Sequence, residues 1–323
     1  MEILFKEGYC IYEDNKNDIV IATPHSGPAF ETSTARDDNS ETVASLCWRK
    51  LGGKLVVANV PRKRLWGVDL NRDIPDLNLA LNMFNLFRNT DDNDEKLYQY
   101  RRRYAWVAKD ETDYNHRLAI YKNFWKEVND AKYVILVHRA LTRIKNISSI
   151  IDIVIVNDTK NKPKIKDIIR DTNNKYYEFL KKIEPSYKKM VMFEEERFVS
   201  NILRVSNQFS LDKINGEFET HLKQDLEKIK LFATPKYYKY LNEDFNSQNF
   251  LRAVKNVIDN SPIPQVTMEY AFDGSLAYGP RHSLTNLNEK IVIEVESSRF
   301  LNFWYPEVAA EMISDIAEKI CKI

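Results

Sequence analysis

The chain has 323 residues, of which 43% are hydrophobic, so it can bury the core of one large domain or of two smaller ones. Its 48 basic and 47 acidic side chains nearly cancel, which excludes a strong overall field that would attract nucleic acid or an anionic membrane. The three cysteines, Cys10, Cys47 and Cys321, stand far apart and indicate neither a disulfide framework nor a thiolate metal site.

The first part of the chain alternates strand and helix patterns. Residues 1–13 alternate apolar and polar side chains, as a strand or a hairpin does. A short buried strand is predicted over 19–22, and it ends before Pro24 because proline cannot donate to a sheet ladder. A helix over 41–51 and a second buried strand over 54–60 complete a β-loop-α-β pattern, which is typical of a parallel sheet.

The remaining elements extend this sheet and surround it with helices. Helical patterns cover 76–130 and most of the lysine-rich span 160–260, which we interpret as a helical insertion or cover on the sheet. Further strands are predicted over 132–137, 152–156, 266–270 and 290–295, and an amphipathic helix over 306–323. Together the elements predict one α/β domain over 1–323, with three α/β/α layers around a mostly parallel, mixed sheet.

Histidine follows two of the predicted strands. His25 comes just past the strand at 19–22, and His138 comes directly after the strand at 132–137. Open α/β sheets bind their ligands at the carboxyl ends of strands, where both histidines would then lie. Glu294 interrupts an otherwise apolar strand, where a carboxylate is costly unless it is paired or bound. Two histidines and a carboxylate are common ligands of a catalytic zinc ion, although hydrogen-bonded structural roles are the alternative for each.

Two other charged segments have structural explanations beside functional ones. Arg101, Arg102 and Arg103 could bind phosphate, but a solvated helix face with its aromatic residues turned inward explains them as well. The segment from Asp69 to Arg72 could be an Asx-type turn with a structural salt bridge.

Two motifs, PHSG at 24–27 and VDLNR at 68–72, resemble those of the N-formylglutamate amidohydrolase family, part of the wider zinc carboxypeptidase-like group. YVILVH, DIVIV and IEVESSRF follow in the order in which the family has similar segments. The collinear pieces span roughly 19–75, 132–157 and 264–301. The resemblance implies a zinc-exopeptidase-like fold.

The resemblance also implies roles for single residues. His25, His138 and Asp37 would bind one zinc ion (Zn2+) per chain, with Asp38 and Glu31 as alternatives to Asp37. The general base that activates the zinc-bound water would be Glu294, and Arg64 would polarise the scissile carbonyl or contact a second carboxylate. The substrate-binding residues would be Asn71, Arg72, Tyr278, Arg281 and His282. Arginine suits the carboxylate-binding task given to Arg72 because its guanidinium can donate two parallel hydrogen bonds.

The chain departs from the family pattern in three places. Arg139 follows the second histidine where serine is usual, Glu296 and Ser297 stand where the family has Asn-Arg, and 160–260 is longer than expected. Each departure changes the expected surroundings of the site more than its reaction.

The expected function is hydrolysis of a small N-acyl amino acid, such as N-formylglutamate, by a zinc-activated water. A zinc carboxypeptidase acting on peptides is the alternative enzyme, and a binding protein that retains the fold without catalysis is the alternative of another class. We expect a small-molecule substrate with a carboxylate, and neither nucleic acid nor membrane as a partner. The chain has no apolar run of about 18 residues and no amino-terminal signal pattern, so a cytoplasmic location is expected.

Overall fold

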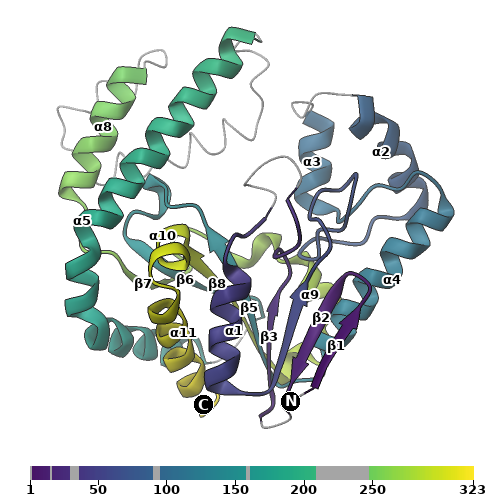
Figure 1. The fold of residues 1–323 in the computed structure, drawn as a ribbon, viewed down its shortest axis with the longest axis horizontal. Coiled ribbons are helices and arrows are strands. Elements are labelled where there is room, and N and C mark those ends of the chain that lie inside the picture. The colour runs from purple at the N-terminus through teal and green to yellow at the C-terminus, as the bar shows by residue number, and fades with distance from the viewer. Residues whose placement is uncertain (1, 15–16, 30–35, 90–94, 158–160, 209–246) are drawn as a thin grey trace.

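The computed structural model describes residues 2–14, 17–29, 36–89, 95–157, 161–208 and 247–323, and a mixed sheet of eight strands runs through its centre (Figure 1). The strands are β1 (Glu2–Lys6), β2 (Tyr9–Glu13), β3 (Ile19–Thr23), β4 (Lys54–Ala58), β5 (Tyr133–Ala140), β6 (Ser149–Ile155), β7 (Gln265–Met268) and β8 (Ile291–Ser298). Their order across the sheet is β1-β2-β4-β3-β5-β8-β6-β7.

The four central strands, β4, β3, β5 and β8, run parallel to one another, so their carboxyl ends share one edge of the sheet. β2 is antiparallel to β4, and β6 is antiparallel to β8, while β7 pairs parallel to β6. The β1–β2 hairpin at one end of the sheet matches the alternating pattern of residues 1–13. The structure therefore confirms an α/β protein with a mixed, mostly parallel sheet.

Helices cover both faces of the sheet. They are α1 (Ser40–Leu51), α2 (Leu77–Asn89), α3 (Glu95–Arg103), α4 (Glu111–Val128), α5 (Lys162–Gln208), α8 (Ser247–Asn260), α9 (Tyr278–Ser283), α10 (Arg299–Trp304) and α11 (Pro306–Ile320). Alternate side chains of β5 enter two separate cores: Ile135 and Val137 pack with α1, α5, α8 and α11, whereas Val134 and Leu136 pack with α2 and α4. This alternation is what a strand buried on both faces requires.

Within the described ranges the predicted elements are present, with some ends displaced, while residues 209–246 of the predicted helical insertion lie outside those ranges. β5 continues to Ala140, so His138 lies within the strand and the prediction that it follows the strand is wrong. The strand is longer because β8 continues beside it, with Ala140 opposite Ser298. α11 begins with Pro306 and buries Met312 and other residues of the predicted apolar stripe.

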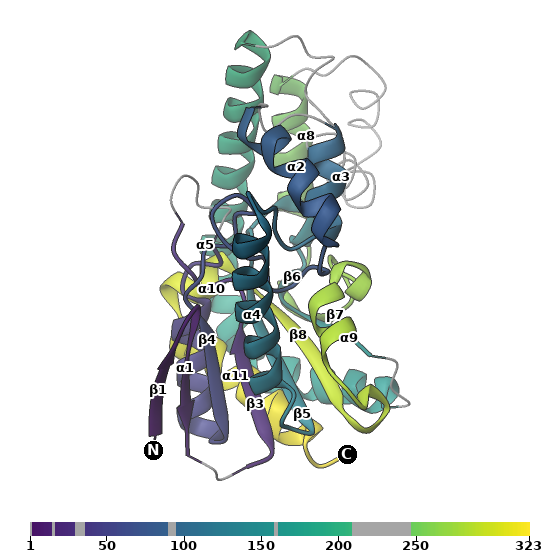
Figure 2. The same ribbon diagram turned by 90° about the vertical axis from the view of Figure 1, so that its right-hand side faces the viewer.

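Part of the helical span at 160–260 forms one of the covering layers. α5 packs against α8, α11 and β7, and its residue Ile165 belongs to the core on that face of the sheet. α5 and α8 on one side, and α2 and α3 on the other, extend past the edge where the parallel strands end (Figures 1 and 2). Within the described ranges, no helix has the length and apolar character needed to cross a membrane.

Candidate metal centre

His25, Asp37 and His138 meet at the carboxyl ends of β3 and β5. Nδ1 of each imidazole faces Oδ2 of Asp37, at 3.3 Å for His25 and 3.0 Å for His138, and the two Nδ1 atoms are 3.1 Å apart. All three side chains are buried. In the part of the chain that the structure describes, they form a group whose ligand atoms are close enough to hold a metal ion, and "metal-binding group" denotes these three candidate ligands.

The turn after β3 positions His25 through contacts with the end of β4. The hydroxyl of Ser26 donates a hydrogen bond to the carbonyl of Ala58 at 2.7 Å. Next to it, a Cβ on Gly27 would lie 1.9 Å from the carbonyl oxygen of Val60, so only glycine allows the two segments to approach this closely. The PHSG motif therefore allows the turn after β3 to pass close to the end of β4, and this approach directs His25 towards β5.

Backbone contacts position the other two members of the group. The backbone amide of Asp37 donates to the carbonyl of His25 at 3.0 Å, and the carbonyl of Asp37 accepts from the amide of Ser40, the first residue of α1. His138 stands opposite Glu296 of the neighbouring parallel strand. Three different elements thus bring the group together.

Asp69 holds the other side of the His25 ring. Oδ1 of this carboxylate is 2.8 Å from Nε2 of His25, and the side chain has no solvent exposure. Burial would raise the pKa of Asp69, but Arg64 and Arg62 hold that pKa well below its usual value, so the group is an anion. An anionic acceptor places the ring proton on Nε2, and the lone pair of Nδ1 then faces His138 and Asp37.

The donor set fits a zinc ion. Two imidazole nitrogens and one carboxylate oxygen are a usual ligand set for catalytic zinc, which keeps a fourth position open. Bonds of about 2.0–2.1 Å in a tetrahedral arrangement space the ligand atoms roughly 3.3–3.4 Å apart. The separations of 3.0, 3.1 and 3.3 Å among Asp37, His25 and His138 are close to this spacing.

Without a metal, the charge of Asp37 is balanced by a proton on His138. Burial would raise the pKa of Asp37, yet the hydrogen bond from His138 and the neighbouring imidazole of His25 hold it well below the usual value. Burial would lower the pKa of His138, but the hydrogen bond with Asp37 and the nearby Glu296 and Glu294 raise it to about 9. The surroundings therefore favour a cation at this position, and a bound metal ion would replace the proton.

Two arginines of the loop after β4, Arg62 and Arg64, both contact Asp69. Nε of Arg62 lies 3.0 Å from Oδ2 of Asp69, and its Nη1 lies 3.8 Å from Oδ1 of Asp37. Arg64 places Nη2 2.9 Å from Oδ2 of Asp69 and donates through Nε to the carbonyl of Tyr104. Arg62, rather than Arg64, is thus the arginine for which an ion-pair contact with a member of the metal-binding group is observed.

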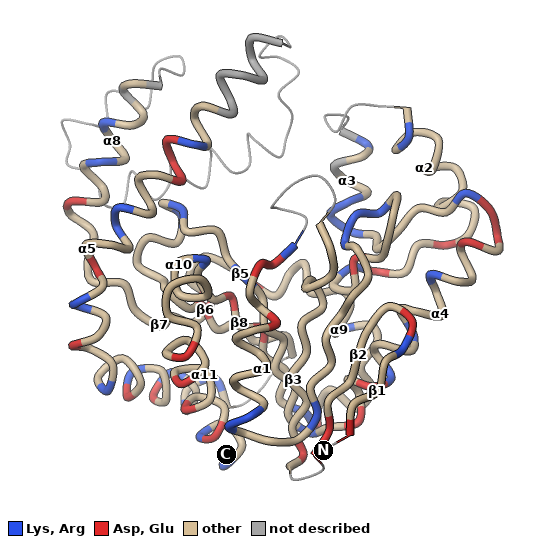
Figure 3. Tube along the Cα trace, in the orientation of Figure 1, with Lys and Arg blue, Asp and Glu red and all other residues tan. Residues whose placement is uncertain are grey.

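Arg117 on α4 fixes this loop. Its guanidinium donates to the carbonyls of Arg64, Leu65 and Gly67 at 2.7–3.1 Å, and to Asp113 one turn earlier at 2.9 Å. Basic residues lie both in this loop and in the last turn of α3, as the blue segments in Figure 3 show. The contact between α4 and this loop therefore holds the backbone that carries Arg62 and Arg64.

Glu294 points from β8 towards the same region. Its Oε1 accepts a hydrogen bond from Nδ2 of Asn71 at 2.8 Å and lies 3.8 Å from Nε2 of His138. This Nε2 atom has no hydrogen-bond partner among the described residues. The carboxylate is buried, as the interrupted apolar strand predicts, and is partnered by an amide rather than an arginine. Glu294 is thus next to the candidate metal centre.

A second carboxylate, Glu296, follows on the same face of β8. Burial raises its pKa to about 7, and the charges of Asp37 and Glu294 act in the same direction, while His138 opposes them. Glu296 also stands opposite His138 in the neighbouring strand, so a second acidic group lies beside this histidine.

Arg72 lies one residue after Asn71, and its Nη1 donates to the carbonyl of Leu276 at 2.9 Å. Its Nε is buried without a hydrogen-bond partner in the described part of the chain, so Arg72 retains a donor for a ligand. Burial lowers its pKa, and the charge of Asp69 opposes this. Asn71 thus contacts Glu294 directly, whereas Arg72 contacts Leu276 in the segment between β7 and β8.

The three residues predicted on the loop before β8 lie in different settings. Tyr278 lines a cavity of about 610 Å³ beside α3. Arg281 donates through Nε to the carbonyl of Val156, and His282 is exposed and contacts Asp73 at 3.1 Å. None of these three contacts the metal-binding group directly, and their role with a substrate stays a prediction.

The alternatives for the acidic ligand are partly resolved. Asp37 belongs to the converging group and Asp38 does not, while Glu31 lies outside the described residues. Arg139, which departs from the family pattern, is buried and donates to the carbonyl of Arg36 at 2.6 Å. It therefore supports the segment that carries Asp37.

The comparisons with known proteins concern the fold alone. No protein-family model matches the chain, and no curated protein matches it significantly. A solved structure, the crystal structure of gene product Atu2144 from Agrobacterium tumefaciens, is similar to it with a TM-score of 0.50 over 98% of both chains, at 11% sequence identity. The fold and the site define a mixed α/β protein with a buried His-Asp-His group that could hold a metal ion.

The sequence did not predict a functional role for three residues of the site, which are Asp69, Arg62 and Glu296. Asp69 was read as part of an Asx-type turn, and the backbone amide of Asn71 does donate to its Oδ1 at 3.1 Å. The signal that could have found it is the acidic residue of VDLNR a few positions after Arg62 and Arg64, since a buried carboxylate needs a charged or hydrogen-bonding partner.

Proposed function

We propose that the chain is a zinc-dependent amidohydrolase with a zinc-exopeptidase-like fold, which cleaves the amide bond of a small N-acyl amino acid. N-formylglutamate is the nearest specific candidate, and its products would be formate and glutamate. One observation carries the proposal: a carboxylate that can accept a proton, Glu294, lies beside a buried His-Asp-His group, with Oε1 3.8 Å from Nε2 of His138.

His25, Asp37 and His138 would hold the ion. Zinc bound there would supply Lewis acidity, which makes a water more acidic and a carbonyl more electrophilic. Asp69 keeps the His25 ring oriented with Nδ1 towards the ion, as carboxylates beside metal-binding histidines do.

Glu294 would act as the general base. It would take a proton from the attacking water and deliver it to the leaving amine. The hydrogen bond from Asn71 at 2.8 Å holds one oxygen of this carboxylate in place. Catalysis of this kind typically contributes about 10²–10⁴-fold to the rate.

Arginines would bind the charges of the substrate. Arg72, with an unpaired buried Nε, would donate to the substrate carboxylate. The negative charge that develops on the carbonyl oxygen would be stabilised by Arg62, which contacts Asp37, with Arg64 held behind it by Asp69. This assigns to Arg62 a part that the resemblance implied for Arg64.

Hydrolysis by a Glu294→Gln variant tests the proposal. The zinc-loaded protein would be mixed with N-formyl and N-acetyl amino acids, and with short peptides, and free amine would be measured. The variant should bind the same amount of zinc and lose about 10²–10⁴-fold in turnover. Equal activity would remove Glu294 from the mechanism, and zinc binding without any hydrolysis by the unmodified protein would favour a non-catalytic binding protein.

A further inference from the structure

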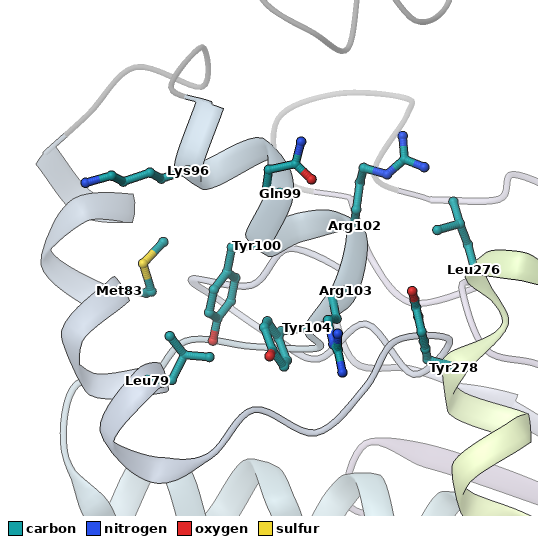
Figure 4. Close-up of a pocket in the computed structure, with 10 residues that line it drawn as sticks. All are labelled: Leu79, Met83, Lys96, Gln99, Tyr100, Arg102, Arg103, Tyr104, Leu276 and Tyr278. Carbon is teal, nitrogen blue, oxygen red and sulfur yellow. The ribbon is translucent and has the colours of Figure 1, made fainter.

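A cavity of about 610 Å³ lies between α2, α3 and the segment that leads into α9 (Figure 4). Leu79 and Met83 of α2 form one side, and Tyr100, Tyr104 and Tyr278 contribute aromatic rings. None of the three members of the metal-binding group lines it. The cavity is therefore separate from the metal centre, although the two share neighbours.

The cavity combines aromatic surface with positive charge. The hydroxyl of Tyr100 donates to the carbonyl of Trp106 at 2.6 Å, and its ring, which is largely buried, forms part of the cavity wall. Arg103 lies over the rings of both Tyr104 and Tyr278, at 5.6 and 5.9 Å from their centroids, and its side chain is 57% exposed. Lys96 and Arg102 also line the cavity (Figure 4).

The cavity adjoins the residue assigned to the substrate carboxylate. Arg72 donates to the carbonyl of Leu276, and Leu276 and Tyr278 both line the cavity. Tyr278, which lines the cavity, and Glu294, the proposed base, both act on the charge of Arg72, so Arg72 is within electrostatic reach of each. With its amide bond at the metal centre and its carboxylate at Arg72, a bound amino acid would have the cavity next to its carboxylate-binding residue.

The size of the cavity argues against a small occupant. Ligand pockets of about 300–1,000 Å³ hold molecules of drug size, with apolar and aromatic walls and a few oriented polar groups. The cavity falls in the middle of this range. A glutamate side chain would leave most of the aromatic surface without a partner.

We propose that this cavity binds the side chain of the amino-acid half of the substrate, and that the preferred side chain is an aromatic ring ending in an acidic group. The proposal rests on the proposed function, and it names the substrate class of the same site. The ring packs on Tyr104 and Tyr278, and the acidic group pairs with Arg103 at the rim.

Calorimetric binding to the full-length, zinc-loaded Glu294→Gln protein tests this. The ligands are N-acetyl-O-phosphotyrosine, N-acetylphenylalanine and N-acetylglutamate, which share the amide and the carboxylate and differ in ring and charge. Affinity should fall in that order. Arg103→Gln should weaken N-acetyl-O-phosphotyrosine about tenfold and leave N-acetylphenylalanine unchanged, because a hydrogen bond to a charged group is lost.

Two further variants complete the test. Met83→Trp fills the cavity from α2 and should weaken both aromatic ligands without weakening N-acetylglutamate. Arg170→Gln is the matched control, because Arg170 is an exposed arginine of α5 that pairs with Asp167, and it should change none of the affinities. Equal affinity for the three ligands, or aromatic binding that is insensitive to Met83→Trp, would overturn the proposal.

The outcomes separate this inference from the proposed function. Aromatic binding that depends on Arg103 and Met83, together with no hydrolysis by the unmodified protein, would uphold the cavity and reject the amidohydrolase. Hydrolysis of N-acetylglutamate without any preference for aromatic ligands would do the reverse.

Discussion

Nε2 of His25 and Oδ1 of Asp69 are 2.8 Å apart, and the carboxylate is fully buried. The contact joins the turn after β3 to the loop after β4, and it determines which nitrogen of the imidazole carries the proton. Because the two arginines Arg62 and Arg64 contact the other oxygen, one side chain links the metal-binding group to the cationic side of the site.

Replacing Asp69 by asparagine should therefore weaken metal binding. Asparagine preserves the size of the side chain but removes the charge that keeps the proton on Nε2 of His25. The zinc affinity, measured by competition with a chelator, should fall about 10–100-fold. Asp130→Asn is the control, because Asp130 is largely exposed and pairs with Lys54 away from the site. An unchanged affinity in Asp69→Asn would contradict the assigned role.

The three histidines His25, His138 and His116 allow a direct test of metal content. His25→Ala and His138→Ala should each lose the metal ion, which we expect at about one per chain, because a three-ligand site does not survive the loss of one ligand. His116→Ala should keep it, since His116 is exposed on α4 and contacts Glu7. Elemental analysis of the purified proteins gives the answer, and metal retained in both site variants would refute the assignment.

The pair Arg143–Glu195 joins the loop after β5 to α5. The two side chains form hydrogen bonds of 2.8 Å through both carboxylate oxygens, and both are buried. Glu195→Ala removes the buried carboxylate that both guanidinium hydrogen bonds reach, and it should lower the free energy of unfolding by about 3–5 kcal/mol. Chemical denaturation measures this.

Glu184→Ala on the same helix is the matched control. Glu184 pairs with Lys188 one turn later near the surface, and such a pair contributes about 0.3–0.5 kcal/mol. A loss in Glu195→Ala no larger than in this control would show that α5 is not anchored by the buried pair.

The stability contributed by Asp113 should depend on pH. Burial would raise its pKa, but hydrogen bonds from Arg117 and from the backbone amide of Lys109 hold the pKa below its ordinary value of 3.8. A lowered pKa in the folded state means that the stabilisation is present above the ordinary value and is lost as the pH falls through the lowered one. Asp113→Asn should be less stable than the unmodified protein by about 1–2 kcal/mol at neutral pH.

The comparison of these two proteins at several pH values isolates the contribution of Asp113 from that of other carboxylates. The difference in unfolding free energy should shrink towards zero below pH 3.8. A difference that is the same at all pH values would mean that the contact contributes through packing rather than charge.

The sequence predicted the two histidines of the site because strand ends can be read from apolar runs. His25 and His138 follow or end such runs, and parallel strands bring their ends to one edge. Asp37 came from the resemblance to a family, since an acidic stretch by itself does not identify which carboxylate turns inward. The covering helices and the hairpin at residues 1–13 followed from periodicity in the same way.

The sequence could not predict features that depend on tertiary contacts. Arg62 and Arg64 stand two positions apart in a loop without periodicity, so tertiary contacts, such as the hydrogen bond from Arg117 to the carbonyl of Arg64, determine which one faces Asp37. The direction of β6 was equally open, because a buried run such as DIVIV is the same in a parallel and an antiparallel strand. The aromatic cavity depends on the pairing of α2 with α3, which no local pattern encodes.

His25 and His138 are 113 positions apart in the sequence, yet their rings touch across neighbouring strands. The site therefore cannot assemble during folding until β3 and β5 have paired, and an unfolded chain offers no preformed competitor for the ion. By mass action, free metal would add to the native state a stabilisation that grows with the logarithm of its concentration. A higher concentration of free metal would thus stabilise the pairing of β3 with β5, and the melting temperature would rise with that concentration.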